Sequence, residues 1–348
     1  MKLLITGVAG SIGRRLINAL QHHSTITIHG CDIQPLDTGN LLFLNPVHFK
    51  QVDLRSPEFT NWVTSVSPDV VIHLASILQI SKHMTRDMAY DIDVLGTKRL
   101  LQACAQCHVK KFIITTSGAA YGYFPENQET ITEERSPRGN QEYFYSAHKA
   151  EIEDILAVFR TTEPHLKQLI FRPGAIVGPN FQGPVVDLLK QKVIVGLQGV
   201  ASPFNFIWSE DVVAYLIEGA VGPITGQFNL AGDGTLTMRE IAQMLNKPYL
   251  PLPELLVKAA LAIVKPLGLS QYGPEQTRFI KYRPVLDNSK LKLTFSHQPT
   301  YNSQEALAAF LQAKPSSVEE FAANTTSMPE QKQKQKQKQG QKQQENSY

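Results

Sequence analysis

The chain has 348 residues, enough for one large or two modest domains with a buried core, and its composition is ordinary for a globular protein. The formal net charge of +3 lies within residues 329–348, where five Lys accompany two Glu, so the neutral remainder does not indicate nucleic-acid binding. No stretch approaches the roughly 18 apolar residues of a spanning helix and no signal-peptide cleavage site follows the apolar start, so we expect a cytoplasmic protein.

The first predicted strand, residues 3–5, runs directly into a glycine-punctuated turn and then into a helix. Such a turn leaves backbone N–H groups pointing at an anion, and the helix N-terminus adds its partial positive charge. Glycines permit positive φ and the close approach of a pyrophosphate. The turn predicts a dinucleotide-binding site, and its candidate residues are Gly7, Gly10, Ser11, Ile12 and Gly13.

Asp32 ends a second apolar stretch, residues 26–31, about 20 residues after the turn. An acid at this position binds the adenosine ribose 2′-hydroxyl of NAD and repels the 2′-phosphate of NADP. Because no Arg follows Asp32 nearby, we expect NAD rather than NADP as the cofactor.

Further short apolar runs at 70–74, 111–114 and 169–171 alternate with helical patterns. This alternation predicts an α/β fold, a doubly wound parallel sheet of Rossmann type covered on both faces. Beyond Gly174, Pro and Gly become frequent and the spacing irregular. We therefore expect an NAD-binding domain over 1–173, re-entered near 206–230, a mainly substrate-binding domain over 174–315, and a tail over 316–348.

Three further segments invite functional interpretations. Residues 104–108, Cys-Ala-Gln-Cys-His, spell a haem-attachment motif, but we expect cysteines packed on a helix because no export signal is present. The apolar stretch 254–269 could be a membrane-surface helix, a hydrophobic lid over the substrate or, as we favour, a helix packed into the smaller domain. The Gln/Lys repeat near the C-terminus predicts a solvated tail, disordered from about residue 325.

Tyr145 and Lys149 are four positions apart, so on a helix their side chains share one face. A nearby ammonium favours the phenolate and is expected to lower the pKa of Tyr145 from about 10 towards the working pH. Such a Tyr can act as general acid or base on a hydroxyl or carbonyl. Ser117, just beyond the 111–114 strand, is placed where a sheet presents ligands and could hydrogen-bond the reacting oxygen, although it could equally satisfy its own loop.

In this order the motifs resemble the extended short-chain dehydrogenase/reductase family, which contains NAD-dependent sugar epimerases and dehydratases. The resemblance spans roughly residues 1–315, and the spacing of Gly7, Gly10 and Gly13 is typical of this family. Further landmarks are Asp32, Asp53-Leu54, His73 to Ser76, Thr116-Ser117, Tyr145 with Lys149, Arg172 to Gly174, Gly178-Pro179, Glu210-Asp211 and Phe228 to Leu230.

The resemblance implies roles for these residues. Asp53 and Leu54 would bracket the adenine, and Leu74 and Ala75 would run along the cofactor. Lys149 would hold the nicotinamide ribose hydroxyls, while Tyr145 would be the acid/base with Ser117 as its partner. Thr116 could share the role of Ser117, and a homodimer is compatible with the family.

Three departures from the family pattern narrow the substrate. Gly118 and Ala119 replace the Asp-Glu pair of the dehydratases, so we exclude dehydration. Phe204 replaces an Arg that grips a diphosphate, for which Arg278 or Arg283 could compensate. Asp93 replaces an Asn and cannot donate a hydrogen bond when ionised.

We therefore expect an NAD-dependent oxidoreductase or epimerase that acts on a secondary alcohol. A sugar or nucleotide-sugar epimerase is favoured. Phe204, which could line an apolar pocket with Phe206 and Trp208, keeps open a 3β-hydroxysteroid-like or other apolar alcohol dehydrogenase. A non-catalytic NAD-binding protein is the alternative from another class, and we expect no metal site.

Overall fold

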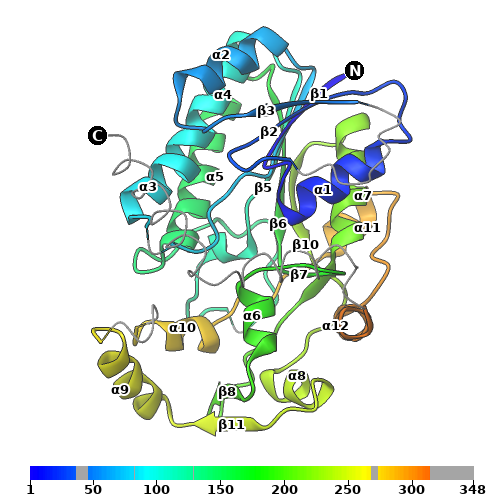
Figure 1. Cartoon of the computed structure of the whole chain (residues 1–348). Coiled ribbons are helices and arrows are strands. Elements are labelled where there is room, and N and C mark those ends of the chain that lie inside the picture. Colours follow the sequence, from blue (N-terminus) through cyan, green and yellow to red (C-terminus); the bar gives the residue numbers. More distant parts are fainter. Residues whose placement is uncertain (37–45, 82, 128, 268–272, 314–348) are drawn as a thin grey trace, which may run out of the picture.

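The computed structural model describes residues 1–36, 46–81, 83–127, 129–267 and 273–313, with seven parallel strands at its centre (Figure 1). Their order in the sheet is β10-β6-β5-β4-β1-β2-β3. The strands are β1 (Lys2–Thr6), β2 (Thr27–Asp32), β3 (Val47–Gln51), β4 (Val70–His73), β5 (Lys111–Thr115), β6 (Lys167–Pro173) and β10 (Gly226–Leu230).

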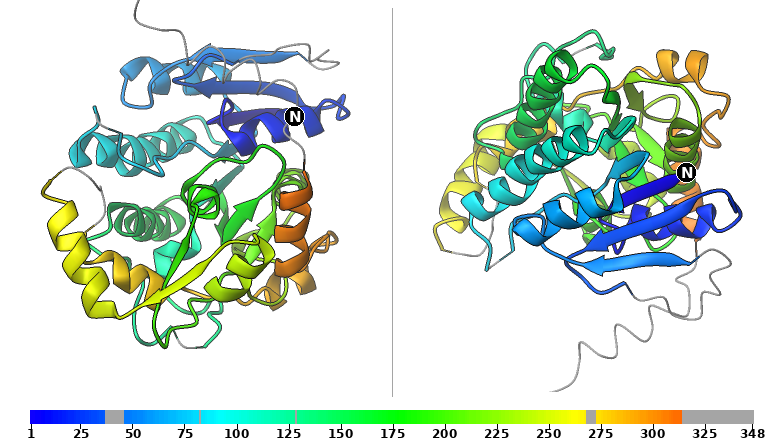
Figure 2. Two further views of the ribbon diagram at one scale, coloured as in Figure 1. Left: turned by 60° about the horizontal axis from the view of Figure 1, so that its bottom comes forward. Right: turned by 90° about the horizontal axis from the view of Figure 1, so that it is seen from above.

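Helices cover both faces of this sheet because its strands are apolar on both sides (Figures 1 and 2). In β1, Leu3 and Ile5 belong to a core cluster with α1 and α7, whereas Leu4 belongs to a cluster with α2, α4 and α5. The helix bounds are α1 (Ser11–Leu20), α2 (Pro57–Val66), α4 (Gly96–Gln106), α5 (Phe144–Thr162) and α7 (Ser209–Val221). The predicted doubly wound fold is confirmed.

The strand order reverses between β1 and β4, because β2 and β3 extend the sheet to one side and β5, β6 and β10 to the other. Ligands of such sheets bind in the crevice outside the carboxyl ends of the strands at this reversal. The glycine turn follows β1 and Leu74 follows β4, so both lie at that crevice.

A smaller group of elements lies at one end of the sheet (Figure 1). It contains two short parallel pairs, β7 (Ala175–Val177) with β9 (Phe206–Trp208) and β8 (Ile194–Leu197) with β11 (Tyr249–Leu252). A third apolar core joins these pairs to α6 (Pro184–Lys190), α8 (Met238–Met244) and α12 (Ser303–Gln312). The remaining elements are α3 (Arg86–Tyr90), the π-helix η1 (Asp91–Leu95), the 3-10 helix η2 (Gly118–Tyr121), α9 (Glu254–Val264), α10 (Gln276–Lys281) and α11 (Ser289–Thr294).

Helix α9 has no fully buried residue, and only one face of it, with Val257, Leu261 and Val264, is half-buried, so the predicted packing of this apolar stretch is limited to that face. Its neighbour is α10, and it lies at the periphery of the molecule (Figures 1 and 2). None of the helices that the structure describes is long and apolar enough to cross a membrane.

The cysteine pattern resembling a haem site is part of the fold, as expected. Cys104 is a fully buried residue of α4, and Cys107 directly follows that helix and is half-buried. Burial raises the pKa of the Cys104 thiol, which makes it a poor nucleophile. The segment predicted to be disordered from about residue 325 lies outside the described residues.

Candidate active site

The glycine turn requires glycine at two positions. Gly7 has φ +74°, and a Cβ there would lie 2.6 Å from the backbone N of Ala75, beyond the end of β4. At Gly13 a Cβ would lie 2.3 Å from the carbonyl oxygen of Gly7. The two glycines therefore let β1, β4 and α1 meet at the crevice.

Several backbone donors of this turn are left for a ligand. Gly10 precedes α1 without a side-chain cap, and the first turn of α1 has no acidic residue. Within the described residues, the N–H groups of Ser11, Ile12 and Gly13 have no acceptor, whereas that of Arg14 donates to Gly10. Three free donors at a helix N-terminus fit a pyrophosphate, so the turn is suited to a dinucleotide.

Asp32 lies at the end of β2 next to the turn. One carboxylate oxygen accepts the Ala9 N–H at 2.9 Å and the other accepts the Gln34 N–H at the same distance. Each oxygen keeps a second lone pair, so the carboxylate can still accept hydrogen bonds from a ribose. Asp32 thus also holds the turn in place, a structural role that spacing alone does not reveal.

The remaining residues predicted to contact the cofactor lie in different surroundings. Leu74 and Ala75 are tied to the turn, because their N–H groups donate to the carbonyl and hydroxyl oxygens of Thr6. Leu54 is buried against α4 in the core. The Asp53 carboxylate pairs with Arg55, with a shortest N–O distance of 2.6 Å, and this hydrogen bond lowers the pKa of Asp53. The predicted adenine contacts of Asp53 and Leu54 stay predictions.

His73 connects the ends of β1 and β4 at the crevice. Its ring lies between the hydroxyls of Thr6, at 2.6 Å, and Thr97, at 3.0 Å, and so joins β1, β4 and α4. Burial lowers the pKa of His73 to about 3, with the nearby Lys149 charge acting in the same direction. The ring is therefore neutral at physiological pH and acts as a hydrogen-bonded link between the two strand ends.

Tyr145 lies in the first turn of α5 and shares a hydrogen bond with Ser117, which follows β5. Ser117 also caps the η2 helix by accepting the Ala119 N–H at 3.0 Å, so its catalytic and loop-forming interpretations both apply. The Thr116 hydroxyl instead donates to Glu153 at 2.8 Å and is buried away from Tyr145. The Thr116 donor is thus engaged by Glu153, which favours Ser117 over Thr116 as the partner of Tyr145.

Lys149 lies one turn further along α5, with its Nζ 5.6 Å from the centroid of the Tyr145 ring. The side chain is 3% exposed, and among the described residues its ammonium has no hydrogen-bond acceptor. An ammonium has three donors, so this group can donate to the vicinal hydroxyls of a ribose. Burial lowers the pKa of Lys149, and the charges of Asp93 and Glu153 oppose that effect.

The prediction that the pKa of Tyr145 is lowered is wrong. Burial raises the pKa of Tyr145; the Ser117 hydrogen bond opposes that rise, and the negative charge of Asp93 adds to it. The physical reason is that desolvation of the phenolate outweighs the stabilisation that the Ser117 hydrogen bond gives it.

Asp93 is the residue that sequence reasoning noted only as a departure. Its carboxylate is 2% exposed, accepts the Ile77 N–H at 2.8 Å and lies 3.3 Å from Nδ1 of His148. It lies in η1 beside α5, and its charge acts on both Tyr145 and Lys149. Because the pairing depends on a contact between residues 55 positions apart, no local pattern could have revealed it.

A buried ion pair supports this arrangement and was also missed. Arg172 in β6 and Glu153 in α5 are 3% and 5% exposed, with Nη2 and Oε2 2.5 Å apart. Glu153 holds Thr116, next to Ser117, and Arg172 donates to the Tyr121 hydroxyl in η2 at 2.8 Å. The pair therefore fixes α5 against the segment that carries Ser117. Its only sequence signal is that Glu153 follows Tyr145 and Lys149 at the same four-residue spacing.

Aromatic side chains lie along one side of Tyr145. Phe279 in α10 lies 4.5 Å from the Tyr143 ring and 4.8 Å from the Tyr123 ring, measured between centroids. Tyr143 in turn lies 6.1 Å from Tyr145. Phe204 and Phe206, by contrast, belong to the core of the smaller group of elements, so ordinary packing accounts for them.

Arg283 covers the ring of Phe204, with its guanidinium carbon 3.9 Å from the ring centroid. Its Nε is buried and has no hydrogen-bond partner among the described residues. Its charge also opposes the rise in the pKa of Tyr123 that burial causes, which places Arg283 near the aromatic group. Arg278, the other candidate, is instead paired with Glu142 at 2.8 Å.

Gly118 and Ala119, where a dehydratase is expected to carry acids, are both buried. A Cβ on Gly118 would already lie 3.0 Å from Leu286, so this wall of the site is apolar and close-packed. The exclusion of dehydration stays a prediction.

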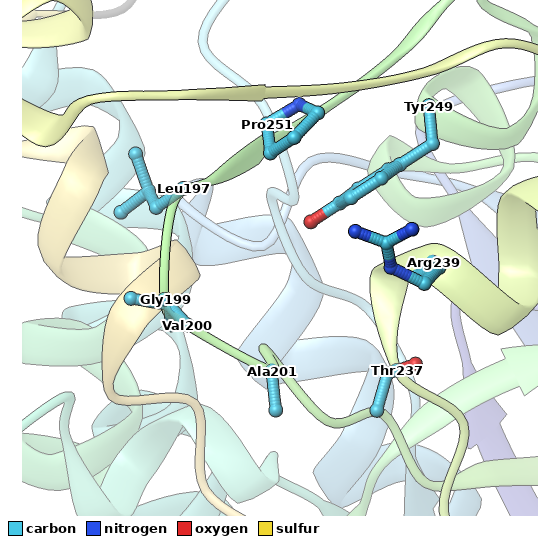
Figure 3. A pocket seen from close by; sticks show the side chains of 8 residues that line it. All are labelled: Leu197, Gly199, Val200, Ala201, Thr237, Arg239, Tyr249 and Pro251. Atoms are coloured by element: carbon cyan, nitrogen blue, oxygen red, sulfur yellow. The ribbon is translucent and has the colours of Figure 1, made fainter.

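A pocket of about 320 Å³ opens in the smaller group of elements, between β8, β11 and α8 (Figure 3). Arg239 and Tyr249 face each other there, with the guanidinium 5.0 Å from the ring centroid. None of its eight lining residues belongs to the glycine turn or to the group around Tyr145, so it is separate from the catalytic candidates.

Comparison with known proteins gives concordant matches. The family model described as "NAD dependent epimerase/dehydratase family" matches residues 3–213. A UDP-glucose 4-epimerase of Mycolicibacterium smegmatis is 26% identical over 266 residues, covering 69% of this chain and 80% of that protein.

Solved structures agree in fold. The UDP-glucose 4-epimerase of Thermus thermophilus in complex with NAD superimposes with a TM-score of 0.68 at 23% identity, covering 90% of this chain and 98% of that one. A UDP-glucuronic acid 4-epimerase of Bacillus cereus, in complex with its nucleotide sugar and NAD, gives 0.68 at 22% identity over 89% and 98%. At these identities the likeness establishes the shared fold.

Proposed function

The chain belongs to the NAD dependent epimerase/dehydratase family, and from this premise we propose that it is an epimerase that inverts a secondary alcohol of a nucleotide sugar. The resemblance to the extended short-chain dehydrogenase/reductase family and the expectation of an NAD-dependent enzyme are thereby confirmed. The alternative of a non-catalytic NAD-binding protein is set aside. The choice of epimerase and of nucleotide sugar is the proposal.

NAD, when bound, accepts a hydride from the carbinol carbon and returns it. The donors of Ser11, Ile12 and Gly13 would hold its pyrophosphate in the turn that Gly7 and Gly10 shape, and Asp32 would hold its adenosine ribose. Asp53, Leu54, Leu74 and Ala75 would line its remaining length, and Lys149 would hold the second ribose.

Tyr145 is the proposed acid/base and carries this proposal, because its hydroxyl shares a hydrogen bond with Ser117 and its ring lies beside the Lys149 ammonium. In its phenolate form it would take the proton of the substrate hydroxyl as the alcohol becomes a ketone, and the resulting phenol would return that proton when the alcohol re-forms. Ser117 would orient the reacting oxygen. Inversion requires the ketone to rotate and present its other face before the hydride returns.

Retention of the cofactor separates an epimerase from a dehydrogenase. We expect mass spectrometry of the purified, denatured protein to show NAD in near-equal amount to the chain, because an epimerase regenerates NAD in each turnover. Release of NADH into solution when an alcohol is added would instead support the dehydrogenase alternative. If NADH is released, the aromatic cluster of Tyr123, Tyr143 and Phe279 favours an apolar alcohol as the substrate.

Arg283 supports a nucleotide sugar as the substrate class. Its Nε is a buried donor that has no partner in the part of the chain that the structure describes, and it covers Phe204, the residue that replaces the diphosphate-gripping Arg. We expect Arg283→Ala to raise KM for UDP-glucose about 10- to 100-fold, because it removes a charged hydrogen bond to a phosphate. Conversion to UDP-galactose, followed by chromatography, measures this change.

Arg278→Ala is the matched control for Arg283→Ala. Arg278 is exposed and already paired with Glu142, so its loss should leave KM within about twofold. Equal KM values for the Arg283 variant and the wild type would contradict the diphosphate role. A wild-type protein that does not convert UDP-glucose but oxidises an uncharged alcohol would favour the dehydrogenase alternative.

A further inference from the structure

The Asp93 side chain contacts two parts of the candidate active site that are distant in the sequence. One carboxylate oxygen accepts the Ile77 N–H at 2.8 Å, in the segment that follows β4. The other lies 3.3 Å from Nδ1 of His148 in α5. Because an ionised carboxylate only accepts hydrogen bonds, Nδ1 carries the proton of this contact. Asp93 therefore connects the β4 side of the crevice with the helix that carries Tyr145 and Lys149.

The main chain of Asp93 is fixed as well. Its carbonyl oxygen accepts the Thr97 hydroxyl at 2.5 Å, and the same hydroxyl lies 3.0 Å from Nε2 of His73 at the end of β4. Asp93 also lies in the π-helix η1, a type of turn that is rare and often found at functional sites. The position of its carboxylate is thus determined by contacts with β4, with the segment after β4 and with α5.

The segment after β4 is held at both ends. Two N–H groups at its start donate to Thr6, which precedes the glycine turn, and the Ile77 N–H donates to Asp93. Between these two anchors, the hydroxyl oxygen of Ser76 is buried and has no hydrogen-bond partner in the described chain. Buried hydroxyls are normally hydrogen-bonded, so the held segment presents a polar group that suits a ligand.

Asp93 is also the carboxylate near Lys149 that no Lys or Arg neutralises. The charges of two carboxylates, Asp93 and Glu153, act on Lys149. Glu153 is paired with Arg172 at 2.5 Å, whereas within the described ranges no Lys or Arg lies within ion-pair distance of Asp93. Both Asp93 and Lys149 are buried, so water and salt screen their attraction only weakly. The Asp93 charge therefore favours the ammonium form of Lys149.

We propose that Asp93 and His148 form a positioning pair that holds the segment after β4 against α5, and that the Asp93 carboxylate is the counter-charge of Lys149. The counter-charge rests on the role proposed above for Lys149 in holding the nicotinamide ribose. Neither Asp93 nor His148 is among the groups proposed to exchange a proton with the substrate, so both act through the residues that they hold. The Asn of the family pattern would offer an acceptor to Ile77 but no charge.

Hydrogen exchange in the peptide that contains Ile77, measured by mass spectrometry on the full-length protein, tests the positioning without any substrate. Asp93→Ala removes the acceptor and should speed exchange of the Ile77 amide at least about tenfold, whereas Asp93→Asn keeps an acceptor oxygen and should leave exchange near the wild-type rate. His148→Ala should speed it about threefold, because one anchor of the carboxylate is lost. Circular dichroism checks that each variant is folded.

His165→Ala is the matched control. His165 also lies beside a carboxylate, that of Glu163 at 3.7 Å, but this pair is exposed beyond the end of α5, so its loss should change nothing. Wild-type exchange at Ile77 in the Asp93→Ala protein would overturn the positioning role.

The pH dependence of NAD affinity tests the counter-charge. Burial lowers the pKa of Lys149 and the Asp93 charge raises it, so removing that charge lowers it further. NAD binding is strongest below this pKa, where Lys149 is charged, and weakens as the pH rises through it. We expect this weakening to begin about one pH unit lower in Asp93→Asn than in the wild type, His148→Ala and His165→Ala. Calorimetric titration of NAD from neutral to alkaline pH measures it, and a merely structural defect would weaken binding at every pH.

Other ionisable groups face Asp93 and Lys149: His73 on β4, Tyr90 on α3, Tyr123 after η2, and Tyr145, His148, Glu151 and Glu153 on α5. Burial lowers the pKa of His73 and raises those of Tyr123 and Tyr145, and the Glu151 hydrogen bond raises the pKa of Tyr90 to about 12. These shifts keep all four groups uncharged at neutral and mildly alkaline pH, and His148→Ala removes any contribution from His148 itself.

Lys149→Met distinguishes failure of this inference from failure of the proposed function. If that variant binds NAD like the wild type at every pH, the ribose role of Lys149 is wrong and the counter-charge with it, while exchange at Ile77 still decides the positioning role. If Lys149→Met weakens NAD binding but Asp93→Asn keeps the wild-type pH dependence, the counter-charge is wrong and the role of Lys149 stands.

Discussion

Tyr145→Phe is expected to lower kcat for the proposed reaction about 10²- to 10⁴-fold, the range that general acid–base catalysis contributes. The substitution removes only the hydroxyl that exchanges the substrate proton and hydrogen-bonds to Ser117. It keeps the ring beside Lys149 and leaves the glycine turn untouched, so NAD binding should be unchanged. Steady-state kinetics together with calorimetric titration of NAD measure both quantities.

Tyr215→Phe is the matched control for Tyr145→Phe. Tyr215 is fully buried in α7, and its hydroxyl has no hydrogen-bond partner among the described residues. Its removal should therefore change neither kcat nor NAD affinity. Wild-type activity in the Tyr145 variant would refute the acid/base assignment, and loss of NAD binding would show that the variant acts through the cofactor site.

Glu153→Ala is expected to lower the free energy of unfolding by about 3–5 kcal/mol, because it leaves the buried Arg172 guanidinium without its counter-charge. It also frees the Thr116 hydroxyl and so loosens α5 against the segment that carries Ser117. We therefore expect kcat to fall as well, although Glu153 is a positioning residue with no contact to the reacting atoms. Urea unfolding and steady-state kinetics measure the two effects.

Two comparisons make this prediction specific. Glu58→Ala removes one partner of the exposed Lys50–Glu58 pair and should cost less than about 1 kcal/mol. Replacing Glu153 and Arg172 together by Met should recover much of the lost stability, because no buried charge is left unpaired. If that double variant regained full kcat, the pair would have no positioning role, and a Glu153→Ala protein as stable as the wild type would contradict the burial argument.

The strongest inferences from the sequence concern local patterns. Alternating apolar runs and helical segments indicated the parallel sheet, because a strand buried on both faces must be apolar throughout, as β4 is. The glycines of the turn reflect backbone requirements that no other residue meets, as the contact between Gly7 and Ala75 shows. Tyr145 and Lys149 share a helical stripe because the helix repeat dictates it.

Pairings between distant segments could not be inferred in this way. The contact of Asp93 with His148 joins residues that are far apart in the chain, and the sequence named both Arg278 and Arg283 as partners for the Phe204 position without a basis for choosing between them. Such contacts depend on how helices and strands pack together. In the sequence, each of these residues is an ordinary charged or aromatic side chain that does not reveal its partner. The direction of the Tyr145 pKa shift likewise depends on burial, which only the packed structure defines.

By itself, the sequence determined the sheet, the dinucleotide turn with Asp32 and the Tyr145–Lys149 stripe, because backbone sterics and helix periodicity act over a few residues. The tertiary structure decided which hydroxyl meets Tyr145, which charges surround Lys149 and which side of α9 faces outward. These properties depend on what packs against each side chain. Desolvation and pairing energies arise only when distant parts of the chain come together.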